Sequence, residues 1–220
     1  MTIVLANWFN PELIRIADLD INAGILISIP AFLLCALITE VYGYKFARRA
    51  IWCGFLFSIF LMLYGQAVIY MPNPNYPTHN AMFDPLLATN IKLALASTLA
   101  YFAAQPLNAY IMAKQKIKWR GRNLGLRLLI ATAITAGISS IIFNLVISYG
   151  TSSPLNLSTV IYATLFIKLA VLLCGLPPTI YLINKLKRVE NSDVYDDHSN
   201  FSVLSLNTEY SAGIGKDTCT

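Results

Sequence analysis

Polar side chains occur inside two long apolar stretches, where they could bind a small solute. One stretch carries four of them at spacings of four, four and three residues: Ser97, Tyr101, Gln105 and Asn108. These spacings place all four on one face of a helix. Such a face suits a planar, hydrogen-bonding ligand. The alternative is that Ser97 and Gln105 only join neighbouring helices, as such residues do with modest gain in membrane proteins.

A cation inside one apolar stretch and an acid at the end of another also need explanation. Lys168 lies inside the last apolar stretch, where an ammonium costs roughly 2.5 to 3.5 kcal/mol, so it should either pair structurally or serve a solute pathway. Glu40 ends the first stretch, at the negative end of the helix dipole, and therefore needs a partner. Its position favours a salt-bridged corner with Lys45, Arg48 or Arg49, and the other possibility is a donor group on a substrate.

The composition indicates that these residues sit in a membrane protein. Of 220 residues, 56% are hydrophobic and 12% are charged. Three windows long enough to span roughly 30 Å of hydrocarbon contain no charged residue: 50–71, 93–113 and 128–150. Two less pure windows are 21–38 and 157–184. These windows show no strand-like alternation, so we predict an all-α bundle of five full transmembrane helices.

The basic residues predict the orientation of this bundle. Twelve of the sixteen cations fall in three segments, 45–49, 114–127 and 185–188, and the intervening loops at 72–90 and 151–155 contain none. Because Lys and Arg stay on the cytoplasmic side, the N-terminus should be outside and the C-terminus inside. Anionic lipid and topology account for the isoelectric point near 9, so no nucleic-acid partner is needed.

The two ends differ from the central bundle, which we place at residues 21–188. Residues 1–20 begin with an apolar segment too short to span, which is either a half-helix or the remnant of a sixth span. Residues 189–220 carry six acids, one lysine and few large apolar residues, a composition typical of a disordered cytoplasmic tail.

Small residues and prolines predict how the helices pack. The window 93–113 is rich in Ala, and the window 128–150 in Ala, Gly and Ser. These small residues let helix backbones approach closely, so the two helices should form the inner pair. Pro106 lies in the middle of one span, and Pro30, Pro177 and Pro178 interrupt two others. The carbonyls they free favour a cavity or a polar neighbour.

An intramembrane enzyme fits the sequence poorly. The two histidines, His79 and His198, fall in a loop and in the tail, and Asp84 near His79 is a weak constellation. The chain has no Gly-x-Ser-x-Gly or His-Glu-x-x-His motif. The four cysteines show neither a disulfide framework nor the spacing of metal ligands. We therefore expect no catalytic residue, no metal and no cofactor.

Four segments of the chain form a recognisable series. The most specific is ITEVYGYKFARRAIWCGF at 38–55. The others are KLALASTLAYFAAQPLNAYI at 92–111, GRNLGLRLL at 121–129 and IKLAVLLCGLPPTIYL at 167–182. In sequence and order they resemble one known family, the queuosine precursor transporters, also called vitamin uptake transporters. The resemblance covers about residues 20–188.

This resemblance implies a bundle of about six helices, like the substrate-capturing subunits of energy-coupling-factor transporters. It implies a protein of the bacterial inner membrane that imports deazaguanine bases such as 7-cyano-7-deazaguanine, used to make the tRNA nucleoside queuosine, without a dedicated ATPase. At the matching positions it implies substrate-binding roles for Glu40, Tyr42, Gln105 and Lys168. A substrate-binding subunit for another vitamin, which requires an ATPase partner, and a homologue that no longer transports stay open as alternatives.

The chain departs from the family pattern at several polar positions. At these positions the chain has an apolar residue, a smaller residue or an amide instead of an acid. The residues are Ala36, Asn108, Leu128, Leu129, Ala136 and Ser139. A guanine-like edge offers a ring N–H beside an amino group, which a carboxylate accepts in two parallel bonds. Without those acids, three alternatives are open: another residue such as Glu40 accepts these hydrogen bonds, the protein binds a different substrate, or it no longer transports.

Overall fold

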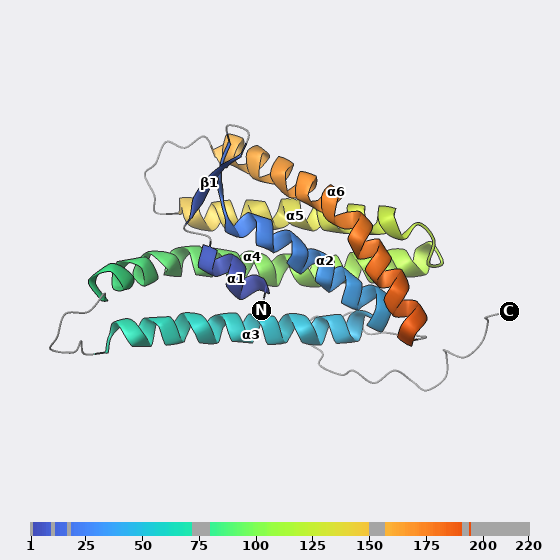
Figure 1. Cartoon of the computed structure of the whole chain (residues 1–220), viewed down its shortest axis with the longest axis horizontal. Helices are drawn as coiled ribbons and strands as arrows, with labels where there is room; N and C mark the ends of the chain where they lie inside the picture. The colour runs from blue at the N-terminus through green and yellow to red at the C-terminus, as the bar shows by residue number, and fades with distance from the viewer. Residues whose placement is uncertain are drawn as a thin grey trace.

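The computed structural model describes residues 2–9, 12–16, 19–71, 80–149, 157–190 and 194. Long helices lying side by side form the body of this part of the chain, with α3 along one edge of the bundle (Figure 1). The elements in chain order are α1 (Thr2–Phe9), β1 (Leu13–Ile16), β2 (Leu19–Asn22), α2 (Gly24–Tyr42), α3 (Tyr44–Ile69), α4 (Asn80–Lys118), α5 (Leu124–Ser148) and α6 (Leu157–Glu190). The predicted helical class is thus confirmed for the described residues.

Helices α2 to α6 match the five predicted apolar windows to within a few residues at each window's apolar core, and each helix is longer than its window. For example, α3 begins at Tyr44, six residues before its uncharged window, and includes Lys45, Arg48 and Arg49. This uncharged window begins directly after the last of these charged residues. The hydrogen bonds of the helix extend past the window into the region where the membrane meets water. The prolines inside α2 and α6 do not end those helices, although α6 turns more steeply over its second half (Figure 1).

By length and apolar composition, four helices of the described chain can cross a membrane: Gly24–Tyr42, Tyr44–Ile69, Leu124–Ser148 and Thr164–Glu190. Helix α4 is long enough but is not among them. Its window carries Tyr101, Gln105, Pro106 and Asn108, which lower its mean hydropathy. The same polar face that marks α4 as a candidate binding helix therefore weakens its signal as a membrane span.

The N-terminal segment is a short helix followed by a hairpin. Helix α1 has eight residues, too few to span a bilayer. The antiparallel hairpin of β1 and β2, which pairs Leu13 with Asn22 and Ile16 with Leu19, was not predicted. Its signal was a period-two alternation of apolar and polar residues within residues 14–22, which is too short to stand out beside the helical windows.

Tight turns bring the basic segments to one end of the bundle. Gly43 alone joins α2 to α3, with a φ of 87° that suits glycine. Residues 119–123 join α4 to α5 and include Gly121 at a φ of 74°. These turns and the C-terminal end of α6 lie at the same end of the bundle (Figure 1). The predicted C-terminal tail begins at the end of α6, and all but residues 189, 190 and 194 lie outside the described residues.

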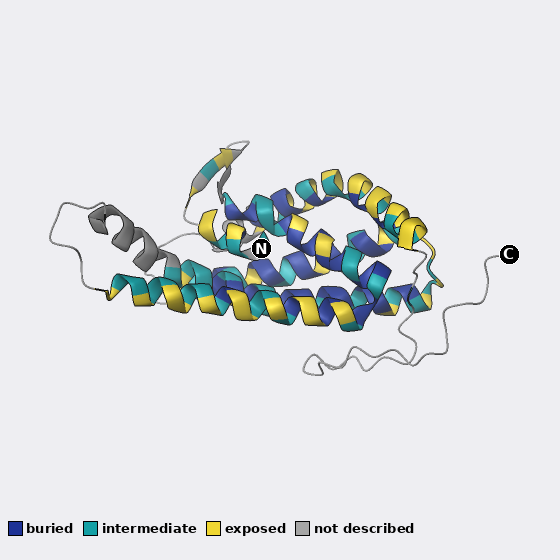
Figure 2. Ribbon diagram, turned by 60° about the horizontal axis from the view of Figure 1, so that its bottom comes forward, coloured by how far each residue is buried: buried dark blue, intermediate teal, exposed yellow. Residues whose placement is uncertain are grey.

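Helices α4 and α5 pack closely against each other, as their small residues predicted. Ala96, Ala104, Ala131 and Ser140 are fully buried along this contact region. An apolar core then joins four helices, through residues that include Ile29 of α2, Met112 of α4, Leu128 of α5 and Ile183 of α6. Exposed apolar side chains lie along α3 and α6 (Figure 2), where a bilayer is the appropriate solvent.

Candidate functional site

A pocket lies between α1, α2, α4, α5 and α6. Its cavity volume is about 80 Å³ and it is open on one side, so a bound base requires the helices around it to move apart slightly. Its lining is mainly apolar, with the aromatic rings of Phe32, Tyr101 and Phe143. The polar lining side chains are those of Asn7, Ser28, Ser97, Tyr101, Gln105, Ser139, Thr164 and Lys168.

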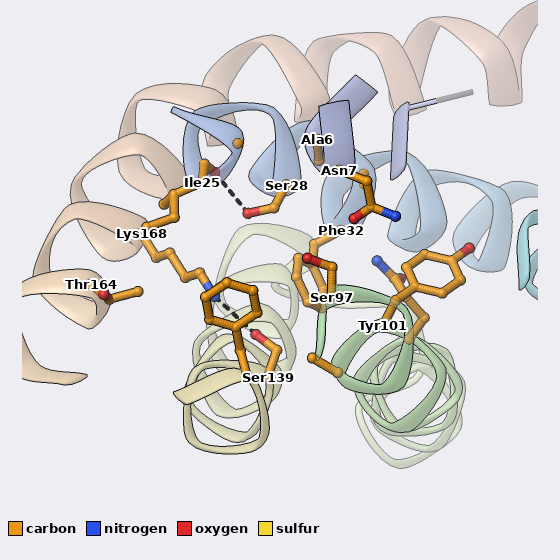
Figure 3. Close-up of a pocket in the computed structure, with 15 residues that line it drawn as sticks. Ala6, Asn7, Ile25, Ser28, Phe32, Ser97, Tyr101, Ser139, Thr164 and Lys168 are labelled. Carbon is orange, nitrogen blue, oxygen red and sulfur yellow. Dashed lines mark hydrogen bonds between the residues drawn. The ribbon is translucent and has the colours of Figure 1, made fainter. Parts of the chain in front are cut away.

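The structure brings three residues of the predicted α4 face into this pocket. Ser97, Tyr101 and Gln105 line it, and Figure 3 shows Ser97 and Tyr101 on the α4 side. Asn108, the fourth, is fully buried outside the pocket lining, and its Nδ2 donates to the carbonyl of Phe32 at 3.2 Å. The predicted face thus divides into three pocket residues and one that joins α4 to α2.

Gln105 has a side chain that the protein itself does not satisfy. It is 1% exposed, and neither Nε2 nor Oε1 has a hydrogen-bond partner. A buried amide left in this way normally costs 1 to 3 kcal/mol, so such groups in native proteins need an explanation. The position of Gln105 in the pocket lining supplies one, because a bound solute can pair with both amide atoms.

Lys168 reaches into the same pocket from α6. Its ammonium donates to the hydroxyl of Ser139 at 3.0 Å and to that of Ser140 at 2.9 Å, and the side chain is 6% exposed. Both hydroxyls in turn donate to the carbonyl of Ala136 at 2.9 Å. Figure 3 shows Lys168 extending across the pocket wall to Ser139 of α5. From the sequence, the expected structural partner of Lys168 was an acid or the end of a helix. The observed partners are instead two neutral hydroxyls.

Glu40 lies at the opposite end of the bundle, away from this pocket. Its Oε1 accepts from Nη2 of Arg127 at 2.9 Å and from Nζ of Lys187 at 2.7 Å, and lies 3.9 Å from Nζ of Lys116. Lys116 also donates to the Glu40 carbonyl at 2.8 Å. With Glu40 only 1% exposed, this group ties α2 to α4, α5 and α6. We call these four residues the Glu40 cluster.

The predicted corner between Glu40 and the start of α3 was therefore wrong. Lys45, Arg48 and Arg49 are near Glu40 in sequence, but the carboxylate points into the bundle, where the cations of three other helices meet it. Burial explains the preference, because a carboxylate removed from water needs several donors around it. Arg127 was counted in the sequence only as part of a basic loop, although it is fully buried.

Tyr42 also lies outside the pocket. Its hydroxyl donates to Oε1 of Glu190 at 2.7 Å, in an exposed contact between the ends of α2 and α6. Of the seven residues singled out from the sequence, the pocket thus gathers Ser97, Tyr101, Gln105 and Lys168. The remaining three, Glu40, Tyr42 and Asn108, hold helices together.

Several pocket residues were missed by the sequence analysis. Asn7 of α1 and Ser28, Phe32 and Thr164 line the pocket, and Ser140 was noted only for its small size. No local pattern identifies them, because each reaches the pocket through the packing of helices distant in sequence. Within the described residues, no cluster of three or more His, Cys, Asp and Glu could hold a metal ion.

The departures from the family pattern lie largely in the packed interior. Ala36 and Leu128 are fully buried in the apolar core, and Leu129 packs against it. Ala136 is buried and supplies the carbonyl that orients Ser139 and Ser140. The apolar side chains of Ala36 and Leu128 therefore leave no buried polar side chain at these two positions that would need a partner.

Comparisons with known proteins show which family the chain matches. Residues 22–183 match the model of a family described as "Putative vitamin uptake transporter". The chain is 26% identical over 175 residues to the "Probable queuosine precursor transporter" of Bacillus subtilis (strain 168), which covers 79% of this chain and 76% of the relative. No solved structure matches the chain. Since the family model spans most of the chain, this multi-pass membrane protein belongs to the vitamin uptake transporter family.

Proposed function

We propose that this protein imports a queuosine precursor, a deazaguanine base, by binding it in the pocket between α1, α2, α4, α5 and α6. One observation carries the proposal: Gln105 lines this pocket, and the donor and the acceptor of its buried amide are both unpaired. The name of the Bacillus subtilis relative supports the same substrate class.

The chemistry of the base suits the polar groups of the pocket. A guanine-type base has a lactam edge, with a ring N–H beside a carbonyl. A primary amide pairs with such an edge through two parallel hydrogen bonds, with Nε2 donating to the carbonyl and Oε1 accepting from the N–H. The rings of Phe32, Tyr101 and Phe143 offer flat apolar surfaces on which a base can stack.

We further propose five spanning helices, α2 to α6, completed by the short helix α1, in an arrangement like that of substrate-capturing subunits. The polar face of α4 turns toward the pocket and toward α2, so it does not face lipid. That placement removes the objection that α4 is too polar to span.

The location of the pocket suggests how transport is gated. Its residues come from the first halves of α2 and α6 and the second half of α5, which is the end away from the basic segments. Much of the apolar core lies between the pocket and the Glu40 cluster, which is at the basic end. With that end in the cytoplasm, release of the base inward requires the Glu40 cluster to separate.

Uptake tests this proposal directly. The gene is introduced into bacterial cells that lack their own precursor transporter and cannot synthesise the base. The accumulation of radiolabelled deazaguanine in these cells is then measured. We expect uptake well above that of an empty vector, and loss of that uptake in Gln105→Leu. Gln115→Leu is the matched control, because it makes the same change on the same helix outside the pocket lining. Uptake equal to the empty vector would contradict the proposal.

A second candidate follows from the family description, which names vitamins. In that case the protein captures another vitamin-like solute and depends on an ATPase module that docks on the basic end. Purification from native membranes separates the two functions. An ATPase pair that copurifies with the protein favours the second, whereas precursor uptake by the protein alone, reconstituted in liposomes, favours the first.

A further inference from the structure

We infer that the pocket selects neutral over positively charged bases, so that its substrate is a planar lactam without an ammonium group. This inference rests on the proposed function, since it specifies the ligand of the same pocket. Two features carry it: the unneutralised ammonium of Lys168 and the neutral amide of Gln105.

The charge of Lys168 has no acid beside it in the pocket. Its acceptors are the hydroxyls of Ser139 and Ser140, which carry no charge. Among the lining residues of the pocket that the structure describes, none is Asp or Glu. An ammonium has three N–H donors, and the protein accepts two of them. The third is available to a carbonyl or nitrile of the solute.

The hydroxyls keep Lys168 in place without cancelling its charge. Each hydroxyl donates its own proton to the Ala136 carbonyl, so its oxygen lone pairs are directed to the ammonium. A carboxylate at Ser139 or Ser140 would have neutralised the charge. The pocket therefore has a positive potential, which the low dielectric of a membrane interior leaves poorly screened.

Gln105 can hydrogen-bond to the base without adding charge to the pocket. It can satisfy a lactam edge, as argued above, but it cannot balance a positive group as a carboxylate would. A second ammonium brought into the pocket would face Lys168, and no acid among the described lining residues would compensate it. Like charges placed together in this way are a strong source of discrimination.

The two common forms of a 7-substituted deazaguanine differ in this respect. The 7-cyano base is neutral, whereas the 7-aminomethyl base is a cation near pH 7, because alkylamines titrate far above that pH. The pocket should therefore bind the 7-cyano base at least about tenfold more tightly than the 7-aminomethyl base.

Binding to the purified full-length protein in lipid nanodiscs tests the inference with three probes: the 7-cyano, 7-aminomethyl and 7-hydroxymethyl bases. The hydroxymethyl base matches the aminomethyl base in size but is neutral. We expect it to bind like the cyano base, with the aminomethyl base at least about tenfold weaker. This comparison needs no mutation, so it holds even where a variant fails to fold.

Lys168→Met provides the second arm. Removing the ammonium should reduce the preference for neutral bases to less than about threefold, while Lys92→Met, at an exposed lysine outside the pocket, should keep the full preference. Equal binding of the aminomethyl and hydroxymethyl bases by the unmodified protein would overturn the inference and leave the proposed function standing. If none of the three bases binds, the proposed function itself is wrong.

Discussion

Oε1 of Glu40 lies 2.9 Å from Nη2 of Arg127, although 87 residues separate them in the sequence. Both side chains are almost completely buried, and Lys187 and Lys116 meet the same carboxylate oxygen. The contact joins α2 to α5 at the basic end of the bundle. It therefore provides a connection that must break if the helices at that end separate during transport.

Glu40→Gln should destabilise the protein strongly. The change leaves the Arg127 guanidinium and the neighbouring lysines without a counter-charge in a buried site, which typically costs 3 to 5 kcal/mol. Thermal unfolding in detergent, followed by circular dichroism, measures the effect. Glu190→Gln is the control, since that carboxylate is exposed and contacts only Tyr42 among the described residues, and we expect less than about 1 kcal/mol there. Equal losses from the two variants would refute the structural role of Glu40.

Gln105→Leu should separate stability from binding. The substitution replaces two unpaired buried polar atoms with apolar ones of similar volume, so the unfolding temperature should stay the same or rise. Affinity for the 7-cyano base should fall at least tenfold, which corresponds to about 1.4 kcal/mol. Isothermal titration of the purified variant, alongside Gln115→Leu, provides the measurement. A large drop in unfolding temperature with unchanged affinity would instead make Gln105 a packing residue.

Lys168→Met should weaken binding of the 7-cyano base about tenfold, to an affinity that can still be measured, while the protein still inserts and folds. Burying the ammonium in the bundle costs roughly 2.5 to 3.5 kcal/mol on insertion scales, and the two serine hydroxyls only partly offset that cost. Removing it should therefore leave stability unchanged or increase it. Membrane fractionation and unfolding curves report folding, and equilibrium binding reports affinity. Unchanged affinity would show that Lys168 serves only to join α6 to α5.

The orientation of the bundle can be tested with topology reporters. With the basic end in the cytoplasm, green fluorescent protein fused after Arg122 should fluoresce, and alkaline phosphatase fused after Met71 should be active. The exchanged fusions serve as controls, because each reporter should be silent at the other site. The reverse pattern would place the pocket on the cytoplasmic side and contradict import by the proposed route.

Much of the helical framework could be predicted because its signals are local. Uncharged windows identify α3, α4 and α5, and the helical period places Ser97, Tyr101 and Gln105 on one face. The hairpin of β1 and β2 was missed because its alternation covers only a few residues. Asn108 was placed with the pocket because spacing cannot show where along a helix a cavity ends.

The sequence by itself determined which segments are helices, which ends carry the basic residues, and which polar groups lie among apolar ones, because each follows from residue type and helical period. Only the tertiary structure decided that Glu40 meets Arg127 and Lys187 instead of the nearer cations of α3. It also decided that Lys168 meets two hydroxyls and that Gln105 is left unpaired in the pocket. The reason is that these contacts join helices distant in sequence, and their order around the bundle depends on how all the buried faces pack together.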